Sequence, residues 1–173
     1  EACKSIKPSW RNELEITDAI QWLIENGHKV DASFVEGWWK DTGKPEDIFE
    51  ANRLILDDID GRCDGEVEES RIMGRVVMEE GTKIRRSVIK GPCIIGRDSI
   101  ISDSYIGPYT SIGIGCQICG TEVEDSIIMD ESRIVNAGKV VESLIGRNVR
   151  IKECDSLPRG SRMIVGDNSD ISL

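Results

Sequence analysis

An aliphatic residue recurs every five or six positions over a long stretch of the chain. This spacing matches neither the 3.6-residue period of an amphipathic helix nor the two-residue alternation of a half-buried strand. It is the period of hexapeptide repeats, in which each unit supplies one short strand and one bend, so we predict a stack of coils with these side chains inside. The positions are Ile72, Met78, Ile84, Ile89, Ile95, Ile101, Ile106, Ile112, Ile118, Val123, Ile128, Ile134, Val140, Ile145 and Ile151.

A small residue stands two positions before each of these aliphatic residues. It is valine, serine, threonine or cysteine everywhere except at Gly138. We expect these side chains to share the interior, where larger ones would clash, and three units to close one triangular coil. The predicted fold class is therefore mainly β: a left-handed parallel β-helix at residues 61–173, preceded by a short α/β segment at residues 1–60.

A longer period sets the number of coils. Ser87-Val88-Ile89 recurs after 17 residues as Ser104-Tyr105-Ile106, then after 22 as Ser126-Ile127-Ile128, and after 17 as Ser143-Leu144-Ile145. We predict roughly five coils, one of them with an extra segment. The spacing is lost after Asp155, and Met163–Val165 is predicted to form a strand in a C-terminal cap, because the ends of repeat arrays need cover.

The first 60 residues follow different rules. Apolar residues at helical spacing predict a helix over Glu13–Asn26 that packs one face and stops at Gly27. Val30–Trp38 is predicted as a strand, and a second helix follows Pro45. Its predicted buried stripe comprises Ile48, Ala51, Asn52, Ile55, Leu56 and Ile59. This order is typical of the closing part of an α/β domain, and one strand is too little for a whole parallel sheet.

Composition excludes several classes of function. The net charge of −10 and the pI near 4.7 argue against a nucleic-acid partner. The chain has no apolar run of 18 residues and no N-terminal signal pattern, so we predict no membrane partner and a cytoplasmic protein.

The six cysteines raise the question of a metal or redox site. Cys116 and Cys119 have C-x-x-C spacing, but neither a second pair nor a histidine accompanies them, and zinc sites normally need four ligands. Cys93 and Cys116 occupy small inward positions of the repeat. We therefore predict buried free thiols.

Two segments before the repeats carry a resemblance to a known family. Arg11-Asn12 is followed by Glu-Leu-Glu-Ile-Thr-Asp at residues 13–18, and Trp-x-Asp-Thr-Gly occupies residues 39–43. These motifs, in this order and followed by hexapeptide repeats, resemble the C-terminal part of the sugar-1-phosphate nucleotidylyltransferases. The long form of glucose-1-phosphate thymidylyltransferase is the most similar type, and the resemblance covers essentially the whole chain.

The resemblance implies a reaction and three site residues. In this family a sugar 1-phosphate attacks the α-phosphorus of a nucleoside triphosphate, and pyrophosphate leaves. By matching motifs, Asp41 would be a ligand of Mg²⁺, Arg11 would contact the sugar phosphate, and Trp39 would lie beside the sugar. Without the resemblance, the same residues would be interpreted as a turn aspartate, a solvated loop charge and a core aromatic.

The chain also departs from the family pattern. It has no counterpart of the family's glycine-rich triphosphate loop, of its first metal-binding aspartate, or of the glutamate–lysine pair that holds the sugar. Gly166-Asp167-Asn168 copies a metal-binding triplet, but beyond the repeats we interpret it as coincidence. We therefore expect residues 1–173 to be part of a longer enzyme and to be inactive alone. Thymidylyl transfer to glucose 1-phosphate is preferred, while uridylyl transfer to glucose or N-acetylglucosamine 1-phosphate stays open.

Two alternatives concern the repeats themselves. The solenoid could be a structural module that assembles a homo-oligomer, with surface residues such as Tyr105 and Tyr109 as contacts. It could also be a hexapeptide acyltransferase, a reaction that commonly needs a histidine base on the solenoid. Because the single histidine, His28, precedes the repeats and is interpreted as a surface loop residue, the acyltransferase alternative is the weaker one.

Overall fold

The computed structural model describes residues 1–37, 39–153 and 169–171. It contains two compact units, Glu1–Trp39 and Lys40–Leu173, and each is considered by itself. Compact units need not coincide with evolutionary domains. The predicted domain boundary after residue 60 therefore stays a prediction. The predicted strand Met163–Val165, the triplet Gly166-Asp167-Asn168 and the sixth cysteine, Cys154, lie outside the described residues.

The first unit contains two helices, α1 (Ala2–Ser5) and α2 (Ile16–Glu25). Helix α2 confirms the helix predicted over Glu13–Asn26. It ends as expected, because Asn26 is the C-cap and Gly27 has a φ of 77°. It begins at Ile16, later than predicted, because the residues before it belong to a turn. In that turn the backbone N–H of Ser9 donates to the carbonyl oxygen of Glu13 at 2.8 Å.

The predicted strand at Val30–Trp38 is wrong. Residues 30–37 form no strand, and their side chains are exposed. A strand is stabilised by hydrogen bonds to a neighbour, and no described residue pairs with this segment. The predicted packing face of α2 is also largely uncovered: Ala19 is buried, but Ile20 and Ile24 are exposed.

The second unit begins with α3 (Pro45–Asp57), which confirms the second predicted helix. Pro45 occupies its first turn, and the backbone N–H of Lys44 donates to Oδ2 of Asp47 at 3.0 Å. The buried stripe is narrower than predicted, since Leu56 is fully buried but Ile55 is half exposed. No described helix is both long and apolar enough to cross a bilayer.

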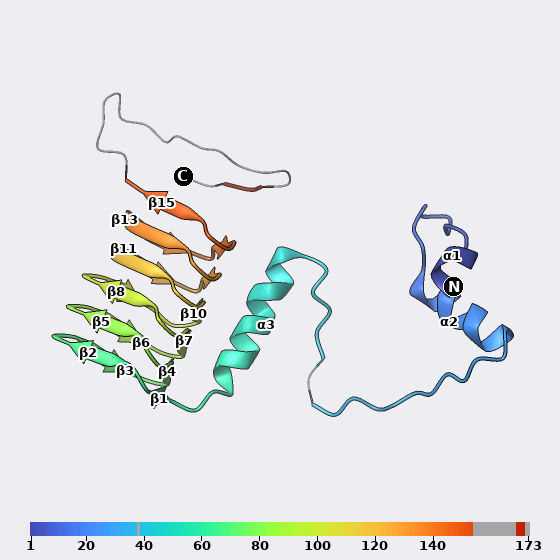
Figure 1. Ribbon diagram of the computed structural model, residues 1–173, viewed down its shortest axis with the longest axis horizontal. Coiled ribbons are helices and arrows are strands. Elements are labelled where there is room, and N and C mark those ends of the chain that lie inside the picture. The colour runs from blue at the N-terminus through green and yellow to red at the C-terminus, as the bar shows by residue number, and fades with distance from the viewer. Residues whose placement is uncertain (38, 154–168, 172–173) are drawn as a thin grey trace, which may run out of the picture. The chain divides into compact units, whose positions relative to one another are not determined.

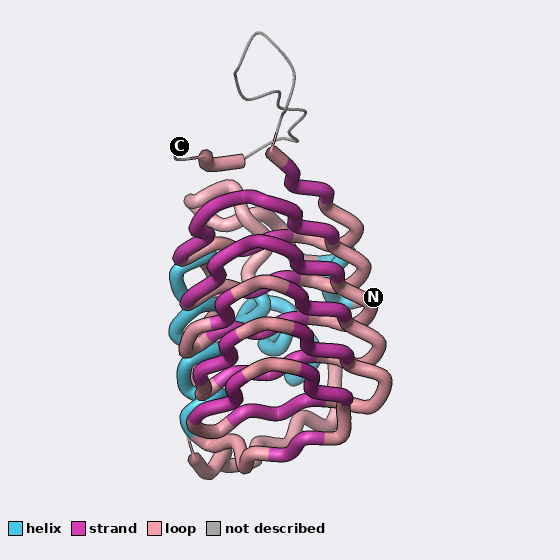
Figure 2. Tube along the Cα trace, turned by 90° about the vertical axis from the view of Figure 1, so that its left-hand side faces the viewer, coloured by secondary structure: helices cyan, strands magenta, loops and turns pink. Residues whose placement is uncertain are grey.

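Short parallel strands follow α3 and are stacked as a parallel β-helix (Figures 1 and 2). The strands are β1 (Arg62–Cys63), β2 (Glu66–Glu68), β3 (Arg71–Met73), β4 (Val76–Met78), β5 (Lys83–Arg85), β6 (Val88–Lys90), β7 (Cys93–Ile95), β8 (Ile100–Ser102), β9 (Tyr105–Ile106), β10 (Thr110–Ile112), β11 (Gln117–Glu124), β12 (Ile127–Ile128), β13 (Arg133–Val141), β14 (Leu144–Ile145) and β15 (Arg150–Lys152).

The strands make three faces. One sheet has the order β1-β4-β7-β10-β12-β14, and its six strands mark five turns of the chain, as predicted. A second face runs β2-β5-β8-β11-β13-β15, and the third comprises β3, β6, β9 and the second halves of β11 and β13. The longer strands β11 and β13 therefore pass around a corner and join two faces.

The predicted ladder forms the core of the stack. Twelve of its fifteen side chains are buried, and Ile72, Val140 and Ile151 are partly buried against them. Equivalent residues pair directly, as Ile84 does with Ile101 and Ile101 with Ile118. The hexapeptide interpretation is therefore confirmed.

The predicted extra segment is wrong. Ile106 pairs with Val123, 17 residues later, so the spacing is unbroken on that face. The triplet ending at Ile128 belongs to the first sheet instead, where Ile128 pairs with Ile112. The triplets look alike because every inward position on every face makes the same demand on residue size.

The small inward residues also join coils through hydrogen bonds. Oγ of Ser104 accepts from the backbone N–H of Thr121 at 3.2 Å, and Oγ of Ser99 accepts from that of Cys116 at 3.0 Å. In each case the two residues are 17 positions apart. A hydroxyl at these positions therefore satisfies a buried N–H of the next coil as well as filling space.

The structure confirms the predicted thiols. Cys93 and Cys116 are buried and free. Burial raises the pKa of the Cys93 thiol to about 12, and burial is also the main cause of the raised pKa of Cys116. Among the described residues, no group of three or more histidine, cysteine, aspartate or glutamate residues could hold a metal ion.

Candidate functional site

Arg11 lies in the loop between α1 and α2, where Glu15 holds its guanidinium. Nη2 of Arg11 is 2.8 Å from Oε1 and 3.0 Å from Oε2 of Glu15, and Nε is 3.2 Å from Oε1. Ser9 completes the arrangement: its hydroxyl donates to Oε1 of Glu15 at 2.8 Å and accepts from the backbone N–H of Arg11 at 3.2 Å. The loop therefore fixes the direction of the arginine.

The charges of this loop support one another. Hydrogen bonds from Arg11, and then from Ser9, hold the pKa of Glu15 below its ordinary value of 4.5, so its carboxylate is ionised at neutral pH. The guanidinium carbon lies 5.9 Å from the centre of the Trp10 ring. The Arg11 side chain is still 52% exposed, and its Nη1 donates to no described residue. An oriented cation with a free edge suits an anionic ligand.

The other two predicted site residues lie in an extended segment. Trp39 is 74% exposed, and Asp41 is exposed with no ion pair to a described residue. Arg11 and Trp39 belong to the first compact unit and Asp41 to the second. The three side chains therefore form no common cluster within either unit, and their predicted roles stay predictions.

The described residues do not by themselves complete a magnesium site. An exposed carboxylate such as that of Asp41 is the right kind of ligand, because Mg²⁺ prefers oxygen in octahedral geometry. No further carboxylates gather around it among the described residues. Asp41 could supply one ligand, and the others would have to come from water, substrate or other protein.

Sequence reasoning missed the residues that hold Arg11 and Lys40. Glu15 stands four positions after Arg11, a charge spacing that could have suggested the pair. Lys40, next to Asp41, forms ion pairs with Asp47 and Glu50 of α3. Their separations of seven and ten residues offered no comparable signal.

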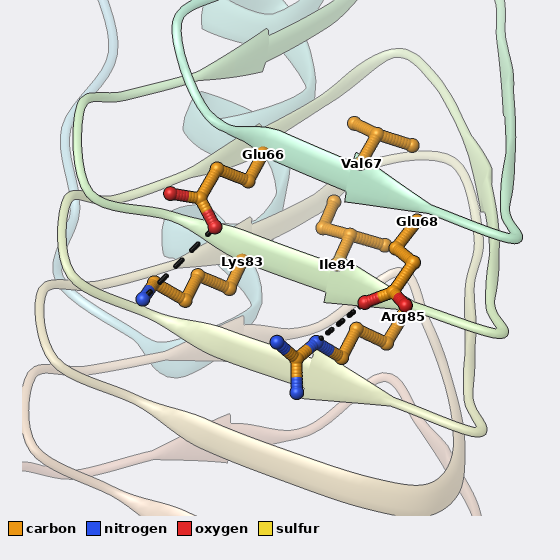
Figure 3. Close-up of a pocket in the computed structure, with 6 residues that line it drawn as sticks. All are labelled: Glu66, Val67, Glu68, Lys83, Ile84 and Arg85. Carbon is orange, nitrogen blue, oxygen red and sulfur yellow. Dashed lines mark ion pairs between the residues drawn. The ribbon is translucent and has the colours of Figure 1, made fainter.

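Two other features of the described residues do not add to the candidate site. His28 lies in the first unit, outside the solenoid, where its ring stacks on that of Trp22 with the centroids 6.2 Å apart. A shallow depression at the start of the solenoid is bordered by β2 and β5 (Figure 3). Its charged side chains pair across the two strands, Lys83 with Glu66 at 4.0 Å and Arg85 with Glu68 at 2.9 Å.

Comparison with known proteins agrees with the motifs around Arg11 and Asp41. A family model described as nucleotidyl transferase matches residues 1–58. The glucose-1-phosphate thymidylyltransferase of Streptomyces antibioticus is 47% identical over 174 residues, which cover 100% of this chain and 49% of that protein. The predicted resemblance to the sugar-1-phosphate nucleotidylyltransferases is confirmed.

Two further relatives extend this comparison. A low-salt glycan biosynthesis nucleotidyltransferase of Haloferax volcanii is 45% identical over 177 residues, or 100% of this chain and 50% of the relative. A bifunctional sugar-1-phosphate nucleotidylyltransferase/acetyltransferase of Sulfurisphaera tokodaii is 38% identical over 152 residues, or 83% and 37%. The chain thus spans about half or less of the length of these three relatives.

Proposed function

We propose that this chain is part of a nucleotidyltransferase that makes a nucleotide-sugar from a sugar 1-phosphate and a nucleoside triphosphate. The observation that carries the proposal is the 47% identity to a glucose-1-phosphate thymidylyltransferase over the whole chain. Thymidylyl transfer to glucose 1-phosphate is the preferred reaction, and uridylyl transfer to glucose or N-acetylglucosamine 1-phosphate is the alternative.

In this proposal Arg11 binds the phosphate of the sugar 1-phosphate. Glu15 holds Nε and Nη2, which leaves Nη1 free to donate to a phosphate oxygen. A charge-assisted hydrogen bond from a fixed donor orients the phosphate as well as attracting it. The attacking oxygen of the sugar phosphate would then already face the α-phosphorus when both substrates are bound. Less entropy would therefore be lost on the way to the transition state.

Trp39 and Asp41 complete the proposed contribution of this chain. The exposed ring of Trp39 offers an apolar surface for a sugar ring. Asp41 would be one ligand of Mg²⁺, which when bound would offset the charge of the phosphate oxygens.

The proposal also covers the contacts of this chain with other protein and its location in the cell. The uncovered apolar residues Ile20, Ile24 and Phe34 support packing of the first unit against further protein. We propose a cytoplasmic enzyme that forms a homo-oligomer through the solenoid. The acyltransferase alternative gains no support, because residues 61–173 contain no histidine that could act as its base.

A chimera tests the proposed function. Residues 1–173 would replace the matching half of the Streptomyces antibioticus relative, and formation of dTDP-glucose from dTTP and glucose 1-phosphate would be assayed. We expect an active chimera in which Arg11→Ala lowers kcat/KM for glucose 1-phosphate by about 10- to 100-fold, the loss of one hydrogen bond to a charged group. The value for dTTP should change little.

Arg147→Ala is the matched control, since this arginine is an exposed solenoid residue paired with Asp130. A folded, active chimera in which the Arg11 and Arg147 variants behaved alike would contradict the role of Arg11. A folded chimera without activity would contradict the proposed function. The 173-residue chain by itself is expected to form no dTDP-glucose, and turnover by it would disprove that expectation.

A further inference from the structure

The residue next to Asp41 is anchored to a helix. Nζ of Lys40 lies 2.6 Å from Oε2 of Glu50 and 3.2 Å from Oδ1 of Asp47, both on α3. The Lys40 side chain is only 26% exposed, although Asp41 beside it is exposed. Because consecutive Cα atoms are about 3.8 Å apart, holding Lys40 restricts where the Asp41 carboxylate can lie.

The loop is closed at its other end by the start of the same helix. The backbone N–H of Lys44 donates to Oδ2 of Asp47, while Oδ1 of Asp47 faces Lys40. One carboxylate thus contacts both ends of residues 40–44, which we call the Asp41 loop. Its position therefore follows that of α3.

The helix is in turn attached to the solenoid by one column of residues, which we call the corner residues: Arg75, Tyr109, Asp125 and Glu142. Each directly precedes a small inward residue, and successive corners belong to different coils. Nε of Arg53 donates to Oδ1 of Asp125 at 3.0 Å, and Nη2 of Arg53 also contacts Asp125. The same Nη2 is 3.6 Å from Oε1 of Glu142.

The rest of α3 contacts earlier coils. Nδ2 of Asn52 donates to the carbonyl oxygen of Tyr109 at 2.9 Å, and its Oδ1 accepts from the hydroxyl of Ser111 at 2.6 Å. Near the end of the helix, the Tyr109 hydroxyl donates to Oδ1 of Asp57 at 3.0 Å. Nη1 of Arg75 donates to the carbonyl oxygen of Asp57 at 2.6 Å. Tyr109, which the sequence suggested as a subunit contact, thus bonds to α3 of its own chain.

These contacts are directional hydrogen bonds, which set orientation as well as proximity. The corner residues come from several coils, so the direction of α3 is defined only when those coils are stacked in register. The solenoid therefore determines where the Asp41 loop lies.

We infer that Lys40 is a positioning residue for the Asp41 loop, and that Tyr109 and Asp125 position this loop through α3. The solenoid then acts on the reaction within its own chain, whatever its part in assembly. The catalytic consequence rests on the proposed function, whereas the positioning itself does not.

Hydrogen–deuterium exchange of the 173-residue chain tests the positioning without any activity. Lys40→Met should raise exchange of the Lys44 backbone amide, which donates to Asp47, by about 3- to 10-fold, because the variant removes both ion-pair contacts of Lys40. Lys40→Arg should restore most of the protection. Lys83→Met, which removes the pair with Glu66 on the solenoid, is the control and should leave the Asp41 loop unchanged.

A second variant tests the route through α3. Arg53→Met should raise exchange both in α3 and at the Lys44 amide, whereas Lys40→Met should raise it at the Lys44 amide alone. Unchanged exchange of the Lys44 amide in both variants would overturn the inference.

The chimera described above then tests the catalytic consequence. Lys40→Met should lower kcat by about tenfold with less than a twofold change in KM for glucose 1-phosphate, and Lys40→Arg should recover the rate. If exchange rises but turnover of an active chimera does not change, the catalytic part of the inference is wrong. An inactive but folded parent chimera would count against the proposed function, while the exchange data would still decide the positioning.

Discussion

The hydroxyl oxygen of Ser87 accepts a hydrogen bond from the backbone N–H of Ser104, 3.1 Å away and one coil further along the chain. The same hydroxyl donates to the carbonyl oxygen of Arg85 at 2.6 Å. Ser87 is buried, so water cannot replace these bonds. The relationship repeats from Ser104 to Thr121, which makes it a property of the stack.

Ser87→Ala should therefore destabilise the solenoid by about 1–3 kcal/mol, because it leaves the N–H of Ser104 buried without an acceptor. Ser143→Ala is the matched control. Ser143 is only partly buried and its hydroxyl donates to the carbonyl oxygen of Val141, without accepting from a backbone N–H of a further described coil, so about 0.5 kcal/mol or less is expected. Urea unfolding followed by circular dichroism measures both, and equal shifts of the midpoint would contradict the proposed role of the buried hydroxyl.

Two adjacent isoleucines distinguish the inside of the stack from its outside. Ile101 is fully buried, whereas Ile100 on the same strand is 42% exposed. Ile101→Ala should cost about 2–5 kcal/mol of the free energy of unfolding, because it leaves a cavity in a packed core. Ile100→Ala should cost less than about 1 kcal/mol. Thermal unfolding compares the two, and a larger loss at Ile100 would refute the assignment of faces.

The pair between Arg11 and Glu15 should be visible in a titration. Because hydrogen bonds from Arg11 and Ser9 lower the pKa of Glu15 in the folded chain, this carboxylate stabilises the loop above pH 4.5. That stabilisation is lost as the pH falls from 4.5 through the lower folded-state pKa. Arg11→Gln should move the pKa of Glu15 up toward 4.5, as measured by NMR of its carboxyl carbon. An unchanged titration curve would mean that the pair does not persist in solution.

Thiol reactivity should follow burial. At pH 8 a thiol with a pKa of about 12 is ionised in only about one molecule in ten thousand, so Cys93 should resist iodoacetamide in the folded chain. The exposed thiols of Cys3 and Cys63 should react under the same conditions. In 8 M urea all three should be modified, as peptide mass spectrometry can show. Rapid labelling of Cys93 without denaturant would indicate that the stack opens.

The core of the solenoid could be predicted because its requirements are local and repeated. Every inward position needs an aliphatic residue, and the residue two places earlier must be small, so fifteen positions carried the same signal. The register was harder, since triplets such as those ending at Ile106 and Ile128 satisfy the same requirement on different faces. The strand predicted at Val30–Trp38 failed for another reason: its pattern was local, but a strand also depends on a partner.

The candidate site was less accessible to sequence reasoning. Arg11, Trp39 and Asp41 came from motifs of a known family, and the structure adds the orientation of Arg11 by Glu15. Nothing in the sequence paired Arg53 with Asp125, which are 72 residues apart. Such contacts depend on the stacking of coils, which brings one corner of each turn into a single column.

The column of corner residues also has a consequence for the order of folding. Each coil pairs only with the coils directly before and after it, so the stack can grow from either end or from the middle, one turn at a time. The helix α3 precedes the whole solenoid in the chain, yet two of its attachments, Asp125 and Glu142, belong to late turns. During synthesis, α3 and the Asp41 loop would therefore reach their final place only after most of the turns have formed.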